Sequence, residues 1–169
     1  MMDSREGLGR FTAAQDAPRT GIAVALAELR EGHKRSHWIW YVFPQLRGLG
    51  TSPMAEHYGI ADLDEAAAYL RHPLLRARLL DAASLVLDHQ RAGVPLATLM
   101  GSRIDVLKLL SSMTLFAAVA RRLADGAVGD DQPGLGQLAD TADAIIAAAG
   151  REGYPPCGDT ERRLARDRS

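Results

Sequence analysis

The 169-residue chain has a single cysteine, Cys157, and lacks any set of cysteines and histidines at zinc-ligand spacing. An intramolecular disulfide is therefore excluded, and no structural zinc site is expected. No apolar run approaches the roughly 18 residues that a membrane helix needs, and the N-terminus carries no apolar signal segment. These absences predict a cytoplasmic protein with no membrane partner.

An excess of charge of one sign is also missing. The chain has 20 Lys and Arg residues against 21 Asp and Glu residues, for a formal net charge of −1. Such a balance gives no overall attraction to nucleic acid or to an anionic membrane. The C-terminal RRLARDR run is basic but interrupted by an acid, which is typical of a solvated end. We therefore predict no nucleic-acid partner, and the oligomeric state stays open.

The sequence also has few β-branched residues and little strict alternation of apolar and polar residues, whereas alanine and leucine are abundant. This pattern favours helix almost throughout. The length suits one domain that buries its own core. We therefore predict an all-α fold, a compact multi-helical single domain of the orthogonal-bundle kind. Residues 1–124 would form its helical core, and residues 125–169 would add a linker, a helix and a C-terminal tail.

Local signals set the expected helix ends. Gly32 and Pro44 are helix stops, Asp62 and Glu65 have capping-box spacing, and Pro73 can open a helix. Loops are expected at 47–53, at the VPLATLMG connector and at the glycine-rich linker 126–136, and a short helix ends the tail. The main helices are expected over residues 4–15, 18–31, 34–43, 62–70, 73–90, 102–124 and 137–149.

The densest chemistry lies in KRSHWIWYVFPQL (34–46), which holds four of the nine aromatic residues directly after a basic pair and a histidine. From Trp38 to Phe43 a helix would carry apolar side chains on every side, so this helix should be buried all round. Its polar groups would then lie together, because one arc of such a helix carries Lys34, His37, Trp38, Tyr41 and Gln45.

Two interpretations of this arc remain open. In the first, His37 and Tyr41 are structural and bond to neighbouring backbone, because a buried polar group left unpaired costs roughly 1–3 kcal/mol. In the second, the helix is one wall of a pocket. Trp38 and Tyr41 would then stack on a planar group, while Lys34 and Arg35 would meet an anion.

A second motif is DVLKLLSSMTLF (105–116). Asp105, Lys108 and Ser112 follow i, i+3, i+7 spacing on one stripe, with Ser111 at its edge. The same stripe continues with apolar residues, so the polar part belongs to a helix that must be largely interior. Asp105 and Lys108 either form a structural ion pair or face a ligand.

Other combinations are less specific. His33 and His37 have the i, i+4 spacing of a zinc pair, but no third ligand follows, so no metal or cofactor is predicted. Ser111, Ser112, His37 and Asp105 include the residue types of a hydrolytic triad, yet no nucleophile-elbow glycines surround the serines.

Three segments together, KRSHWIWYVFPQLRGLG, MAEHYGIADLDEAAAYLRHPLLRARL and DVLKLLSSMTLF, resemble the bacterial family called domain of unknown function eighteen-ten. Some members carry the label calpastatin, for which these residues give no physical basis. The resemblance covers roughly residues 8 to 120 and implies a compact, mainly helical fold without an established activity. Two departures are Leu110, where the family tends to have arginine, and a C-terminal part that is only loosely comparable.

The two motifs lead to one main hypothesis and two alternatives. The main hypothesis is that a pocket between them binds a small anionic, nucleotide-like ligand. One alternative is a hydrolase or N-glycosidase acting on a nucleotide-derived substrate, with His37 or Asp105 as general base; the other is a protein-interaction module without chemistry. The expected ligand-binding residues are Lys34, Arg35, Ser36, Trp38, Tyr41, Gln45, Lys108, Ser111 and Ser112.

Overall fold

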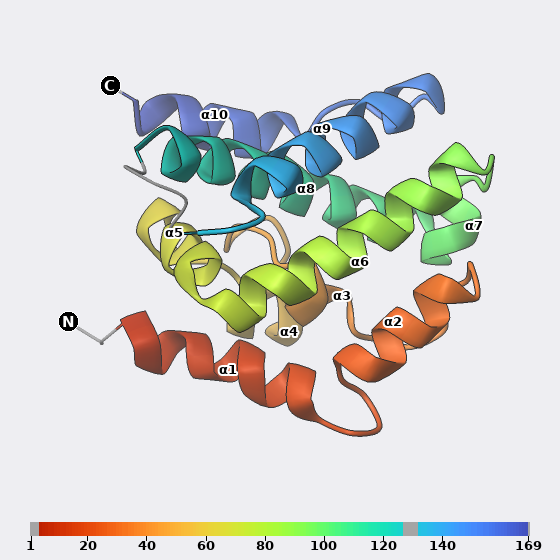
Figure 1. Ribbon diagram of the computed structural model, residues 1–169, viewed down its shortest axis with the longest axis horizontal. Helices are drawn as coiled ribbons and strands as arrows, with labels where there is room; N and C mark the ends of the chain where they lie inside the picture. The colour runs from red at the N-terminus through yellow and green to blue at the C-terminus, as the bar shows by residue number, and fades with distance from the viewer. Residues whose placement is uncertain (1–3, 127–131, 169) are drawn as a thin grey trace.

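The computed structural model describes residues 4–126 and 132–168 (Figure 1). Within these ranges every regular element is a helix, apart from one isolated parallel bridge between Leu46 and Ile60, so the all-α prediction is confirmed. The helices of the described ranges are α1 Ser4–Asp16, α2 Ile22–Arg30, α3 Ile39–Val42, α4 Pro53–His57, α5 Leu63–Arg71, α6 Pro73–Arg91, α7 Leu96–Met100, α8 Arg103–Gly126, α9 Leu135–Arg151 and α10 Gly158–Arg166.

Helix α8 is the centre of the fold. It packs along α9 and also contacts α3, α5, α7 and α10, while α1 and α2 lie on the far side of α6 in Figure 1. Its middle is interior on all sides, as the sequence predicts for this segment. The α8 side chains that enter the core include Val106, Leu109, Leu110, Met113, Leu115, Phe116 and Val119.

Side-chain caps define the starts of α5 and α8, and the one at Asp62 is the capping box that the sequence predicts. Asp62 Oδ1 accepts a hydrogen bond from the Glu65 amide at 2.8 Å, and the Glu65 carboxylate accepts from the amide of Ala61 at 2.7 Å. Ser102 Oγ caps α8 in the same way, accepting from the Asp105 amide at 3.1 Å. These bonds satisfy amide groups that have no partner inside the helix. The cap at Ser102 also fixes the first turn of α8, which carries Asp105.

The predicted helix over residues 34–43 is wrong for its first half. Only Ile39–Val42 is helical, and the backbone bends through the preceding residues. The reason is that the amides there have partners elsewhere: Lys34 donates to the Leu99 carbonyl at 2.7 Å, and the next two amides donate to Glu28. The predicted burial is confirmed, because the side chains of Trp38, Ile39, Val42 and Phe43 are almost fully buried.

Other predicted boundaries shift. Helix α2 begins at Ile22 rather than residue 18, because a turn at Ala17–Gly21 precedes it. Short helices α4 and α7 occupy positions expected to be loop or connector. Of the predicted linker 126–136, residues 127–131 lie outside the described ranges.

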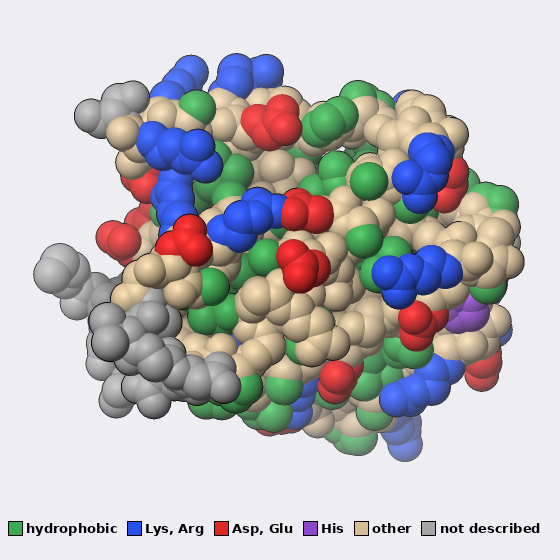
Figure 2. Space-filling view, turned by 45° about the horizontal axis from the view of Figure 1, so that its top comes forward, with side chains coloured by type: hydrophobic (Ala, Val, Ile, Leu, Met, Phe, Trp, Pro, Cys, Tyr) green, Lys and Arg blue, Asp and Glu red, His purple; other side chains and the backbone are tan. Residues whose placement is uncertain are grey.

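The surface mixes charges of both signs, as the balanced composition predicts. In the face drawn in Figure 2, basic and acidic side chains alternate, with small apolar patches between them. In the described ranges, no helix combines the length and the hydrophobicity needed to cross a bilayer.

Candidate functional site

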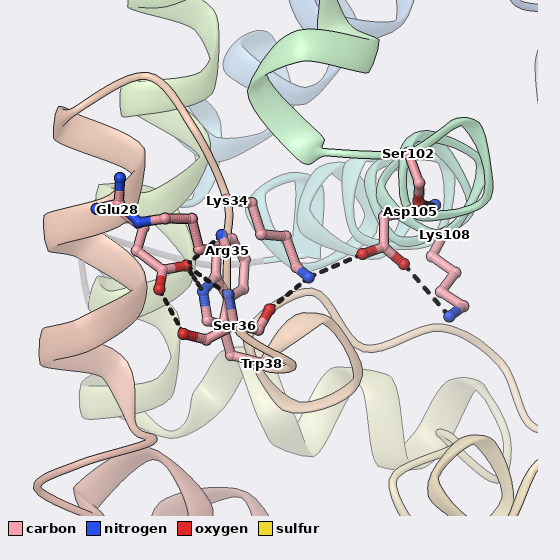
Figure 3. A network of polar contacts seen from close by, with 8 residues as sticks. All are labelled: Glu28, Lys34, Arg35, Ser36, Trp38, Ser102, Asp105 and Lys108. Atoms are coloured by element: carbon pink, nitrogen blue, oxygen red, sulfur yellow. Dashed lines mark hydrogen bonds and ion pairs between the residues drawn. The ribbon is translucent and has the colours of Figure 1, made fainter.

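The buried carboxylate of Glu28 organises the bent segment that precedes α3 (Figure 3). It accepts hydrogen bonds from the backbone amides of Arg35 at 2.9 Å and Ser36 at 3.0 Å, and from the Trp38 indole Nε1 at 2.8 Å. The Ser36 hydroxyl donates to its other oxygen. Glu28 is only 6% exposed, so these four donors replace the water that the carboxylate loses on folding.

These bonds determine the protonation state of Glu28. Burial by itself would raise the pKa of this carboxyl group. The hydrogen bonds from the Ser36 side chain, the two backbone amides and the Trp38 indole outweigh burial and lower the pKa to about 2. Glu28 is therefore ionised at any physiological pH, and its charge serves the structure of the segment.

A second polar cluster joins the two sequence motifs. Asp105, in the first turn of α8, lies between two ammonium groups: Lys34 Nζ is 2.8 Å from Oδ2, and Lys108 Nζ is 3.4 Å from Oδ1 (Figure 3). Lys34 is buried and also donates to the Ser36 carbonyl at 2.5 Å. Gly101 lets the backbone approach this point, because its φ is +79° and a Cβ there would meet the Lys34 carbonyl at 2.9 Å.

Both lysines of the chain take part in this cluster. The chain has 18 arginines and only two lysines, and both lysines pair with Asp105. Each ammonium also lies over an indole ring, Lys34 at 5.2 Å from the ring centre of Trp38 and Lys108 at 4.5 Å from that of Trp40. Two cations share one carboxylate, so the cluster carries one positive charge in excess.

Beside Lys108 the surface is hollowed. The hollow lies between α3, α4 and α8 and is largely open to solvent, with a cavity volume of only about 10 Å³. Its lining combines aromatic and aliphatic side chains with the polar residues Lys108 and Gln45. The lining residues are Ile39, Trp40, Phe43, Gln45, Ala55, Tyr58, Gly59 and Lys108.

One lining residue has a buried polar atom without a partner. The indole Nε1 of Trp40 is buried and has no acceptor within the described ranges. Buried polar groups are normally paired, so an unpaired one beside the hollow indicates a place where an outside partner can bind.

Comparison with known proteins agrees with this architecture. Residues 5–126 match the family described as "Protein of unknown function (DUF1810)", and this match covers well over half of the chain. The chain belongs to this family. The membership expected from the three motifs is thereby confirmed, and the match ends with α8, before α9 and α10.

One solved structure similar to this DUF1810 protein is the conserved hypothetical protein Rv1873 from Mycobacterium tuberculosis. It is 39% identical, with a TM-score of 0.66, and the alignment covers 90% of this chain and 92% of that chain. No curated protein matches the sequence.

The structure divides the predicted ligand-binding residues into two groups. Gln45 and Lys108 line the hollow, whereas Lys34, Ser36 and Trp38 form the internal network around Glu28 and Asp105. Trp38 is fully buried, so no face of its ring is open for stacking.

Tyr41 also lies inside. Its hydroxyl donates to the Thr20 carbonyl at 2.5 Å, and burial, followed by the neighbouring Tyr58, raises its pKa. By contrast, Arg35 and His37 are exposed, and the Arg35 guanidinium pairs with Glu31 at the surface. The His37 ring bonds to no described residue, so it is not joined to Asp105. In the described ranges, no three His, Cys, Asp or Glu side chains are grouped to hold a metal ion.

The two serines of the second motif differ in their bonding. Ser111 Oγ donates to the Leu107 carbonyl at 3.0 Å and lies 3.1 Å from Cys157 Sγ. Ser112 is fully buried, and its hydroxyl has no partner among the described residues. Both serines are therefore closed off from the hollow by their positions in the core of α8.

This difference predicts opposite responses to alanine. Ser112→Ala should leave the free energy of unfolding within about 0.5 kcal/mol of the original or raise it, because it removes an unpaired buried hydroxyl. Ser111→Ala should lower it by about 1 kcal/mol, because a bonded hydroxyl is lost. Urea unfolding of both variants measures the difference. A larger loss for Ser112→Ala than for Ser111→Ala would contradict the assignment.

The sequence motifs alone missed Glu28 and Trp40. Glu28 follows Ala25 at i+3 and precedes Leu29, and all three residues are buried on α2, so an acid on an apolar stripe was the available signal. Trp40 lies inside the first motif, but the assumed helix over residues 34–43 put Trp38 on the polar arc in its place.

Proposed function

We propose that this protein binds a small anionic ligand in the hollow between α3, α4 and α8. The observation that carries the proposal is that Lys108, from the positively charged Asp105 cluster, lines the same hollow as Gln45 and as Trp40, whose buried indole Nε1 has no partner among the described residues. Gln45 can donate through its amide nitrogen, and Lys108 supplies the charge. The aromatic rings of Trp40 and Tyr58 form the adjoining walls.

The size of the hollow limits the ligand. Pockets that enclose a drug-sized molecule have about 300–1,000 Å³. This hollow has a cavity volume of about 10 Å³, room for about one water-sized group. It therefore suits the charged end of a ligand whose remainder lies outside the hollow. A nucleotide would have to leave most of its surface outside, so the nucleotide form of the hypothesis is the less favoured one.

The positions of the two residues expected to act as general base favour binding over catalysis. Both carboxylate oxygens of Asp105 are paired with ammonium groups, and Asp105 does not line the hollow. His37 is exposed on the bent segment before α3. A general base must reach the proton that it removes, and neither residue borders the proposed ligand position.

The two tryptophans provide the test. The chain has two tryptophans, so a ¹H–¹⁵N spectrum shows two indole N–H signals. One comes from Trp38, which is bonded to Glu28, and the other from Trp40 at the hollow. The signal that disappears in Trp40→Phe is that of Trp40. Titration with benzoate, inorganic phosphate and adenosine monophosphate should move the Trp40 signal for at least one anion and leave the Trp38 signal in place. If none of the three moves the Trp40 signal, the proposal is wrong.

Charge-matched variants make the test specific. Lys108→Gln should weaken binding of the active anion about tenfold or more, because it removes the cation at the hollow. Arg35→Gln removes the same charge from the exposed residue that pairs with Glu31, and should leave affinity nearly unchanged. Equal losses in both variants would show that the anion responds only to overall charge.

A further inference from the structure

The charge at the hollow matches a single negative charge. Lys108 is the only cationic residue among the described residues that line it, and it shares Asp105 with Lys34. Arg47 approaches Gly59, but its guanidinium is bonded to the carbonyl oxygens of Glu56 and Gly59 and does not line the hollow. The charge that the hollow presents to a ligand is therefore the single positive charge of Lys108.

A phosphate monoester makes other demands. It carries about −1.5 to −2 charges at neutral pH and three strong acceptor oxygens, and proteins commonly meet it with bidentate arginines. The hollow offers one ammonium and one amide donor instead. A carboxylate, with one charge and two oxygens, uses both donors and leaves no charge unmatched.

Two exposed apolar side chains lie on α8 near Lys108. Ile104, 67% exposed, lies one helical turn before Lys108 and therefore on the same face of the helix. Leu107, 41% exposed, lies one turn after Ile104 and beside it on the helix surface. These two side chains can cover an apolar chain that leaves the hollow past Lys108.

From this combination we infer that the ligand is a carboxylate carried on an apolar chain, an inference that rests on the proposed function. The carboxylate accepts hydrogen bonds from Lys108 and Gln45, and the chain follows Ile104 and Leu107 on α8. A free organic acid and the C-terminus of a peptide with an apolar last residue share this chemistry.

The test compares four small probes by the Trp40 indole signal: hexanoate, acetate, hexanamide and phenyl phosphate. Hexanoate should bind about tenfold or more tightly than acetate, because each methylene that leaves water adds roughly fourfold. Hexanamide should bind at least about tenfold more weakly than hexanoate, because it lacks the charge. Phenyl phosphate should bind more weakly than hexanoate.

The outcomes separate this inference from the proposed function. If phenyl phosphate binds as tightly as hexanoate or more tightly, the carboxylate assignment is wrong while anion binding stands. If acetate equals hexanoate, the apolar part is wrong. If none of the three anions of the first titration moves the Trp40 signal, the proposed function itself fails.

Exposed leucines supply a matched pair of variants. Leu107→Ser should remove most of the advantage of hexanoate over acetate and leave acetate affinity unchanged. Leu74→Ser, at a position on α6 that is 43% exposed and does not adjoin the hollow, should alter neither affinity. Both side chains are at the surface, so folding is not at stake. Equal effects of the two substitutions would overturn the assigned path of the chain.

A peptide arm distinguishes the two sources. A tetrapeptide ending in leucine is titrated with a free C-terminus and with an amidated one. Tighter binding of the free form than of hexanoate supports a peptide C-terminus as the source, and weaker binding supports a free acid. Equal affinity of the free and amidated peptides would overturn recognition of the carboxylate.

Discussion

Glu28→Ala is expected to lower the free energy of unfolding by about 3–5 kcal/mol, because each buried donor left without a partner costs roughly 1–3 kcal/mol. The substitution leaves the Trp38 indole and the amides of Arg35 and Ser36 without their acceptor. Trp38 is fully buried, so water cannot replace the carboxylate there. Chemical denaturation by urea measures the loss, with the slope checked for two-state behaviour.

Glu31 provides the control for this prediction. It lies at the end of the same helix and pairs with Arg35, but both side chains are more than half exposed. Glu31→Ala should therefore change the free energy of unfolding by no more than about 0.5 kcal/mol. Similar losses in the two variants would mean that the bonds to Glu28 add nothing beyond a surface charge.

The same carboxylate makes stability depend on pH. The folded-state pKa of Glu28, about 2, lies below the ordinary value of 4.5. Its contribution is therefore complete above the ordinary pKa and is lost as the pH falls through the folded pKa. The original protein should lose more stability than Glu28→Gln between about pH 5 and pH 2. Burial would raise the pKa of Glu65, but its hydrogen bond with Arg10 lowers it. Glu65 is present in both proteins, so its contribution cancels in the comparison.

The fold class could be predicted from the sequence because its signals are local. Apolar spacing, the capping box at Asp62 and the helix opening at Pro73 act over a few residues, and the structure has these helix starts. The bent segment before α3 depends on a partner from another helix. Its residues favour helix, but Glu28 on α2 takes the amides of Arg35 and Ser36.

The candidate site could be predicted only in part for the same reason. Lys108 and Gln45 belong to the two motifs, and the hollow borders residues of both motif segments. Tyr58 and Gly59 reach it through tertiary packing alone, since the segment after α4 pairs with the strand-like residues 45–47. Sequence spacing also could not show that Lys34 turns inward to Asp105 rather than toward a ligand.

Asp105→Asn should also lower the free energy of unfolding strongly, by about 3–5 kcal/mol, because it leaves the charge of a buried lysine unpaired. The Lys34 side chain is only 6% exposed and has Asp105 as its carboxylate partner. Lys34→Met should cost less, because it removes the buried charge and Asp105 keeps Lys108. Thermal and urea unfolding of both variants give the two values.

The double variant tests whether these residues act as a pair. Once Lys34 is methionine, Asp105→Asn no longer leaves a buried cation without a partner. The loss in the double variant should therefore be smaller than the sum of the two single losses, by about 0.5–3 kcal/mol. Simple additivity would contradict the pairing.

The affinity of the hollow for an anion should not fall with stability in Asp105→Asn, because removing the carboxylate raises the positive charge of the cluster beside Lys108. Stability falls while benzoate or hexanoate binds at least as tightly, a combination that a structural Asp105 requires and a ligand-contacting Asp105 does not allow.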